Sequence, residues 1–270
     1  MLFKRIITAS ILGPLFFGAI WWGNPLTNGA IFCGLSLIFL YECWGIWGGF
    51  NGGDTGTALL GLYCLLGVIP GVLKVLAGIL LPFWVWAFWY LMIDYLLVLS
   101  CYPSLDSPFV RMAIAAFCHF YIGLFLYSSL SMLDLRQSNE LVVYLLICVF
   151  SGDIFAYFGG KALGRHRLCP GVSPKKTIEG AICGLAASIA FGTMYMEISD
   201  VWGVGPWVVA LASLGLGVTA QLGDLVESIL KRTFNVKDSS NFLPGHGGFL
   251  DRFDGVILAT PCLLLILQVT

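Results

Sequence analysis

The sequence predicts an all-α integral membrane protein, built as a bundle of about nine transmembrane helices. Of its 270 residues, 59% are hydrophobic and only 11% are charged, whereas soluble domains usually carry about a quarter charged residues. Apolar runs long enough to cross a bilayer recur along the chain. Basic residues also favour alternate connections between these runs, as the positive-inside rule requires.

Nine segments have the length and composition of a membrane span, and Gly, Pro, Asn and Asp mark the short connections between them. The first follows Lys4 and Arg5 and is interpreted as a span, because no small-residue cleavage site of a signal peptide follows it. Only Lys74 separates the third from the fourth. The spans are expected at residues 6–22, 29–47, 57–73, 77–99, 109–130, 141–160, 178–196, 206–230 and 255–270.

The distribution of charge predicts the orientation. With the N-terminus in the cytoplasm, twelve of the 14 basic residues fall inside and only Lys74 and Arg136 fall outside. Nine of the 14 lie in two segments, 161–176 and 231–252. The net charge of −1 gives no reason to expect a nucleic-acid partner, and the nine cysteines form no CxxC pair that would indicate a zinc or redox site.

The end of the span at 206–230 carries an unusual polar face. Asp224, Glu227, Ser228 and Lys231 are spaced i, i+3, i+4 and i+7, so they share one side of a helix. A carboxylate within the bilayer costs about 2.5–3.5 kcal/mol unless it is paired or solvated. Two interpretations remain open: a metal or substrate site in a polar cavity, or a Glu227–Lys231 pair with Asp224 near the interface.

A glycine-rich loop follows, with the sequence Pro244-Gly245-His246-Gly247-Gly248. Glycine allows close approach of backbone to a ligand, and the N–H groups of such a loop can hold phosphate oxygens. Asp251 and Asp254 then open the last apolar run and would share a helical face. They could bind a ligand or simply stabilise the helix N-terminus.

Taken together, these residue types indicate phosphate chemistry. Carboxylate oxygens suit Mg²⁺, which binds one or two carboxylates plus substrate phosphates, and lysine and arginine suit phosphate chains. Nucleotidyl transfer needs mainly positioning, a metal ion and cations around the oxygens. His246 is the only histidine in this stretch, so a Ser–His–Asp array is not indicated.

Two motifs resemble those of the phosphatidate cytidylyltransferase (CDP-diacylglycerol synthase) family. The first is Ser228-x2-Lys231-Arg232-x4-Lys237-Asp238-x5-Pro244-Gly-His-Gly-Gly248-x2-Asp251-Arg252-Phe-Asp254. The second comprises Ser151-Gly-Asp153 with Lys161 and Arg165, followed by Ser173-Pro-Lys175-Lys176-Thr177-Ile-Glu179-Gly180. The resemblance covers roughly residues 150–260 and is dense enough to make a chance match improbable.

The resemblance implies a helical membrane enzyme that converts CTP and phosphatidic acid into CDP-diacylglycerol and pyrophosphate in phospholipid biosynthesis. It implies Mg²⁺, sometimes with a second cation such as K⁺, and a homodimer. The compact sequence without a polar N-terminal extension suggests a bacterial inner membrane. One polytopic domain, 1–270, would hold variable spans in 1–140 and the catalytic spans and cytoplasmic loops in 141–270. Its polar active-site cavity would face the cytoplasm, and its metal-binding pair maps onto Asp224 and Asp251.

The remaining roles are assigned by chemistry. Catalytic roles fall to Asp224, Asp251, Lys231 and Arg252. Asp153 and Glu179 could bind a cation or sugar, or merely neutralise the basic loop. The substrate-binding candidates are Ser173, Lys175, Lys176, Arg232, Lys237, Asp238, His246, Gly247, Gly248, Asp254, Asp153 and Glu179.

Two other classes of function remain possible on the sequence alone. One is another CTP-dependent membrane lipid enzyme, such as a polyprenol or phytol kinase or an archaeal-type CDP-lipid synthase. The other is a transporter, although no internal repeat is visible. Outside the motifs, Glu42 and Asp94 are intramembrane acids and therefore candidate functional residues, or they lie near span ends. His119 is interpreted as a packed, hydrogen-bonded histidine.

Overall fold

The computed structural model describes residues 13–47, 53–101, 107–243 and 247–270. In this part of the chain, eight helices are long and apolar enough to cross a membrane, and residues 13–22 are also helical. The helices are α2 (Pro25–Trp47), α3 (Gly53–Ala77), α4 (Phe83–Cys101), α5 (Pro108–Met132), α6 (Ser138–Leu163), α7 (Ile178–Ser199), α8 (Pro206–Thr233) and α9 (Leu250–Val269). The predicted fold class of an all-helical integral membrane protein is confirmed.

The eight helices follow the predicted spans closely, with one correction. Lys74 does not separate two spans but lies in the last turn of α3, and α4 begins only at Phe83. The Lys74 ammonium pairs with Asp134 across 2.6 Å, so a charge at the end of an apolar run is retained inside the helix. Residues 6–12 of the first predicted span lie outside the described residues.

Several helix ends follow from local sequence. Pro108 occupies the first turn of α5, where its missing N–H is not needed. Thr177 caps α7 by accepting a hydrogen bond from Gly180 N at 3.2 Å. Asp200 ends α7 in the left-handed conformation, at φ 48°. Prolines 70 and 261 lie within α3 and α9, as membrane helices tolerate.

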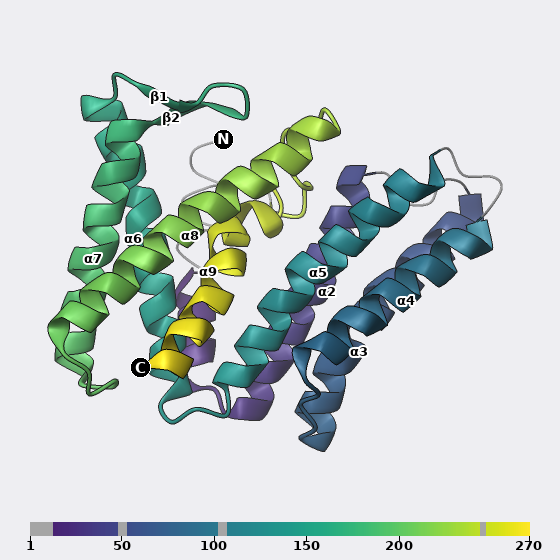
Figure 1. Ribbon diagram of the computed structural model, residues 1–270, viewed down its shortest axis with the longest axis horizontal. Coiled ribbons are helices and arrows are strands. Elements are labelled where there is room, and N and C mark those ends of the chain that lie inside the picture. Colours follow the sequence, from purple (N-terminus) through teal and green to yellow (C-terminus); the bar gives the residue numbers. More distant parts are fainter. Residues whose placement is uncertain (1–12, 48–52, 102–106, 244–246) are drawn as a thin grey trace. The chain divides into compact units, whose positions relative to one another are not determined.

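The chain divides into two compact units. The first unit contains residues 1–13, 23–134 and 234–251, and the second contains residues 14–22, 135–233 and 252–270. In the first unit, α2 packs against α3 and α5, and α4 packs against α5 (Figure 1). Rings of Phe39, Phe125, Trp44 and Tyr63 fill the space between these helices.

A buried Asp–His pair joins α4 and α5 in the first unit. His119 Nδ1 lies 2.9 Å from Asp94 Oδ1, and its Nε2 lies 3.2 Å from the Tyr63 carbonyl oxygen. Both side chains are completely buried. The prediction of a hydrogen-bonded, packed His119 is confirmed, and Asp94 lies inside the unit rather than at an exposed helix end.

Close backbone approaches hold the second unit together. A Cβ at Gly152 would lie 2.6 Å from Ser188 Oγ on α7, and a Cβ at Gly217 on α8 would lie 2.9 Å from the same atom. A Cβ at Gly223 would collide with the backbone oxygen of Asp254 on α9. Small residues therefore let these helices pack at short range, as is typical inside membranes.

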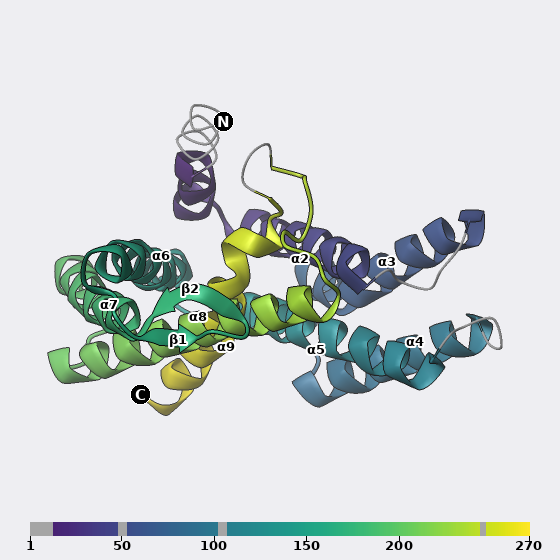
Figure 2. The ribbon, with the colours of Figure 1, turned by 90° about the horizontal axis from the view of Figure 1, so that it is seen from above.

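The connection between α6 and α7 forms a small antiparallel hairpin that the sequence analysis did not predict. Strand β1 (Arg167–Cys169) pairs with β2 (Ser173–Thr177), with Arg167 opposite Thr177 (Figure 2). The strands are short and polar, and β2 contains Pro174, so the alternation that indicates a strand is missing. The hairpin places Lys175 and Lys176 directly before the start of α7.

Candidate functional site

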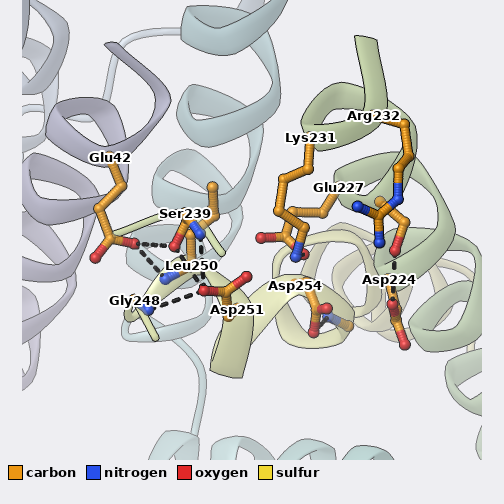
Figure 3. Close-up of polar contacts among 12 residues, drawn as sticks. Glu42, Asp224, Glu227, Lys231, Arg232, Ser239, Gly248, Leu250, Asp251 and Asp254 are labelled. Atoms are coloured by element: carbon orange, nitrogen blue, oxygen red, sulfur yellow. Dashed lines mark hydrogen bonds and ion pairs between the residues drawn. The ribbon is translucent and has the colours of Figure 1, made fainter. Parts of the chain in front are cut away.

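The polar residues of the two motifs form two groups, one in each unit. The first unit contains the Glu42 network, defined here as Glu42, Ser239, Ser240, Gly248 and Asp251. The second unit contains the acid–lysine cluster, defined as Asp153, Lys176, Asp224, Glu227, Lys231, Arg252 and Asp254. Figure 3 shows most of these side chains.

The polar face of α8 carries two ion pairs. Glu227 binds Lys231 one turn later across 2.7 Å, and only 1% and 11% of these side chains are exposed. Asp224 forms an ion pair with Lys176 of β2 and accepts a long, 3.4 Å hydrogen bond from Ser228 Oγ. The predicted Glu227–Lys231 pair is therefore confirmed. Asp224, however, is paired with Lys176 of the second motif, which spacing along α8 could not indicate.

Two further carboxylates crowd the same place. Asp254, from the first turns of α9, is repelled by the carboxylates of Asp224, Glu227 and Asp153. Asp153, on α6, is repelled by Asp224 and attracted by Lys176 and Arg252. The acid–lysine cluster thus brings four carboxylates together with three cationic groups. Neighbouring carboxylates that repel one another are unfavourable unless a cation or proton joins them.

This donor set suits a hard cation. Carboxylate oxygens are the ligands Mg²⁺ prefers, and Mg²⁺ usually takes only one or two of them from protein. Among the described residues, no three His, Cys, Asp or Glu side chains are arranged as a ready-made metal site. The fit therefore rests on the mutual repulsion of Asp224 and Asp254, which a bound cation would relieve.

In the Glu42 network, one buried carboxylate of α2 binds residues on both sides of the glycine-rich loop. Glu42 Oε1 accepts hydrogen bonds from Ser240 Oγ at 2.6 Å and the Phe249 amide at 2.9 Å. Its Oε2 accepts from Ser239 Oγ at 3.0 Å and the Leu250 amide at 2.7 Å (Figure 3). Glu42 is 1% exposed. The side chain therefore has a hydrogen-bonded position inside the unit and does not lie at the surface of a span end.

Asp251 completes the network from the start of α9. Its Oδ2 accepts from the Gly248 amide at 2.8 Å, the Ser239 amide at 2.9 Å and Ser239 Oγ at 3.0 Å. The bond from an amide three residues earlier is typical of helix capping. The capping interpretation of Asp251 therefore holds for this oxygen.

The two described glycines of the loop, Gly247 and Gly248, are required by close packing. Gly247 adopts φ +81°, and a Cβ there would lie 2.6 Å from Asp251 Oδ2. A Cβ at Gly248 would lie 2.5 and 2.6 Å from the two carboxylate oxygens of Glu42. Any side chain would displace the network, so both positions require glycine. His246 lies outside the described residues.

Glu179 has a local structural role at the start of α7. It accepts from the Arg165 amide at 3.0 Å, the His166 amide at 3.2 Å and His166 Nδ1 at 2.6 Å. Arg232 Nε reaches the Val172 carbonyl at 3.5 Å, which joins α8 to the hairpin. These contacts hold the 164–177 connection beside the end of α8.

The other predicted binding residues lie at the surface. Lys175, Lys237 and Asp238 are exposed, and Ser173 is half-buried. Ser239 and Ser240 were not predicted as site residues, because a Ser-Ser pair in a loop carries no distinctive signal. Asp224 and Asp251 belong to different units, and their joint role in metal binding stays a prediction.

Comparison with known proteins agrees with the motifs. The cytidylyltransferase family matches residues 3–270. Phosphatidate cytidylyltransferase of Brucella abortus is 45% identical over 150 residues, 54% of each chain. That of Rickettsia bellii is 37% identical over 206 residues, 72% of this chain and 89% of the relative. That of Bacillus subtilis is 40% identical over 149 residues, 54% of this chain and 55% of the relative.

The matches to the Brucella and Bacillus proteins therefore span about half the length of those relatives. The match to the family as a whole is much longer and includes both motifs and every described helix. Since it extends over nearly all 270 residues, the chain belongs to the cytidylyltransferase family.

Proposed function

We propose that this membrane protein is a CTP:phosphatidate cytidylyltransferase, which converts CTP and phosphatidic acid into CDP-diacylglycerol and pyrophosphate. The observation that carries the proposal is the acid–lysine cluster, where Lys176 of the second motif pairs with Asp224, one helical turn before the first motif begins at Ser228. Such a set of carboxylates and cations suits a polyphosphate substrate with a divalent ion. The names of the Brucella, Rickettsia and Bacillus relatives support the same reaction.

In this reaction an oxygen of the phosphatidate phosphate attacks the α-phosphorus of CTP. A new P–O–P bond forms, the bond between the α- and β-phosphates breaks, and pyrophosphate leaves with its electron pair. The nucleophile is already anionic, so a general base contributes little. The chief obstacle is repulsion between two anions, which cationic side chains reduce.

We assign the phosphate-binding role to the basic side chains of the motifs. An ammonium group has three N–H donors, so a lysine that holds a carboxylate can also hold a phosphate oxygen. Lys176 and Lys231 would act in this way within the cluster. The more exposed members of the set are Lys175, Arg232, Lys237 and Arg252. Ser173, Asp238 and the loop amides near Gly247 would complete the contacts to substrate.

The proposed metal ligands are Asp224 and Asp251. Asp254 lies one helical turn after Asp251 on α9 and is repelled by Asp224, which is compatible with a shared cation. A bound Mg²⁺ would neutralise charge on the phosphates and stabilise the leaving pyrophosphate. A second cation such as K⁺ is part of the proposal, as is a homodimer.

The proposed orientation places this chemistry at the cytoplasmic face. Two spans, α7 and α8, separate the 164–177 connection from the 234–249 connection, so both lie on one side of the membrane. The segments that contain these connections, 161–176 and 231–252, hold nine of the 14 basic residues, which favours the cytoplasm. CTP would enter from there, while the acyl chains of the lipid stay in the bilayer and its head group enters a polar cavity.

A turnover assay tests the proposal. Purified protein in detergent with Mg²⁺ should release pyrophosphate from CTP only when phosphatidic acid is present, and should form CDP-diacylglycerol. Polyprenol, phytol and archaeal ether lipids serve as competing acceptors. Preference for one of these would instead support another CTP-dependent lipid enzyme, and absence of CTP turnover would favour a transporter.

Asp224→Asn tests the site itself. The substitution should lower turnover roughly 100-fold, the range seen when groups around a metal are removed. Asp200→Asn is a matched control, because Asp200 is exposed and lies at the C-terminal end of α7, whereas Lys176, the partner of Asp224, lies just before its N-terminal end. Its φ of 48° is one that asparagine tolerates. Full activity of the Asp224→Asn protein would remove this residue from the mechanism.

A further inference from the structure

Glu42 lies far along the chain from the motifs, yet it holds one of them. It comes from α2, and its four hydrogen-bond donors lie 197 to 208 residues later. All of these residues belong to the first unit. A carboxylate in a membrane helix is costly unless its oxygens are satisfied. Here both oxygens accept hydrogen bonds from Ser239, Ser240 and the two residues at the start of α9.

The four partners match an ionised carboxylate. An ionised glutamate only accepts hydrogen bonds, at about four lone-pair sites. Glu42 receives two hydroxyl donors and two amide donors, two at each oxygen, at 2.6 to 3.0 Å. A glutamine would keep one acceptor oxygen and turn an N–H₂ group towards donors. The network therefore distinguishes a carboxylate from its closest neutral analogue.

Two of the donors belong to the start of a helix. The amides of Phe249 and Leu250 stand at the N-terminus of α9, where N–H groups have no partner within the helix. Glu42 thus caps α9 from a different helix, and its negative charge also suits the helix dipole. The next residue is Asp251. Fixing the first amides of α9 fixes the position from which Asp251 projects.

Ser239 connects the two carboxylates directly. Its hydroxyl lies 3.0 Å from Glu42 Oε2 and 3.0 Å from Asp251 Oδ2. A hydroxyl has one proton and can donate to only one of them at a time. If a cation binds Asp251, the hydroxyl proton of Ser239 can be donated to Glu42 instead. Asp251 then still accepts hydrogen bonds from the amides of Ser239 and Gly248.

We propose that Glu42 is a positioning residue for cytidylyl transfer. It holds Ser239, Ser240 and the start of α9 so that Asp251 is oriented for its cation, and Ser239 transmits the effect between the two carboxylates. This inference rests on the proposed function. It assigns a functional role to a residue of the N-terminal spans, outside both motifs.

The test compares Glu42→Gln with Glu197→Gln in the full-length protein. Glu197 is an exposed residue of α7, so the control makes the same chemical change outside both polar groups. Glu42→Gln should reduce kcat with phosphatidic acid roughly 10- to 100-fold, the usual effect of a residue that supports a metal ligand. The Mg²⁺ concentration for half-maximal activity should rise about tenfold.

Hydrogen exchange provides a readout that does not depend on turnover. Peptides covering residues 239–250 should exchange faster in Glu42→Gln, while peptides of α7 should match the control. A purely structural role would reduce the amount of active protein but leave the Mg²⁺ dependence unchanged. Glu42→Asp retains the charge and should recover part of the Mg²⁺ affinity.

A second variant keeps the test decisive if Glu42→Gln fails to fold. Ser239→Ala removes the bridging hydroxyl but leaves the amide bonds to Asp251, and should raise the Mg²⁺ requirement several-fold. An unchanged Mg²⁺ requirement in a folded Glu42→Gln protein, or in Ser239→Ala, overturns the proposal for Glu42 while the wild-type reaction stands. An inactive wild type with CTP and phosphatidic acid overturns the proposed function itself.

Discussion

Replacing Gly248 by alanine tests how tightly the Glu42 network is packed. The new Cβ would lie 2.5 and 2.6 Å from the oxygens of Glu42, and closer still to Ser239 Oγ. To reach an ordinary van der Waals separation, these atoms must retreat by about 1 Å. Such a shift takes hydrogen bonds of 2.6 to 3.0 Å beyond their useful range.

The size of the effect follows from two contributions. Overpacking a close-packed site costs about 1–3 kcal/mol. Losing a hydrogen bond to a charged group costs about 1.5–3 kcal/mol more. A local destabilisation of at least about 3 kcal/mol corresponds to a roughly 100-fold smaller population of the ordered segment, since about 1.4 kcal/mol is a factor of ten.

Hydrogen exchange in detergent measures this directly. Amides of residues 239–243 and 247–250 should exchange on the order of 100-fold faster in Gly248→Ala, and turnover should fall with them. Gly45→Ala is the matched control, because Gly45 lies in α2 beside Glu42, is exposed, and has open space at its Cβ. It should be neutral or slightly stabilising. Unchanged exchange in Gly248→Ala, or equal acceleration in both variants, would refute the geometry described for the loop.

Two other predictions concern the second unit. Glu227→Gln leaves Lys231 buried beside a neutral group and should lower the free energy of unfolding by about 3 kcal/mol, measured by thermal unfolding. The double variant Glu227→Gln/Lys231→Met should recover part of that stability. A double variant as unstable as Glu227→Gln, or less stable, would contradict the pairing. For orientation, a membrane-impermeant maleimide should label Asp200→Cys in intact cells but Lys175→Cys only after permeabilisation, because these residues lie at opposite ends of α7. The reverse pattern would place both polar connections outside the cell.

Much of the fold could be predicted because a single requirement controls it. Helices in lipid must be long, apolar and bounded by polar connections, so the sequence shows them directly. Lys74 was wrongly expected to separate two spans. It lies inside α3 because it pairs with Asp134, which comes from the connection after α5 and could not be identified as its partner from the sequence. The hairpin was missed because the short Ser173–Thr177 strand forms where two packed helices must be joined, with no apolar pattern of its own.

The sequence predicted which residues make up much of the candidate site, but not which of them pair with one another across different helices. The spacing along α8 correctly predicts the Glu227–Lys231 pair, because both members lie on one helix. It could not predict the pairing of Asp224 with Lys176, which depends on how the hairpin meets α8. Glu42 was recognised as an intramembrane acid, but its partners depend on the folded arrangement of the first unit.

The place where α9 begins has a practical consequence for protein engineering. The segment that ends at Asp251 belongs with the N-terminal helices, although the sequence motif runs on without a break. A chimaera that joins the C-terminal half of this chain to the first four helices of a relative would leave the amides of Phe249 and Leu250 without their acceptor. Such a hybrid should work only if the donor protein supplies an acid at the position of Glu42, or if residues 234–251 are exchanged together with those helices.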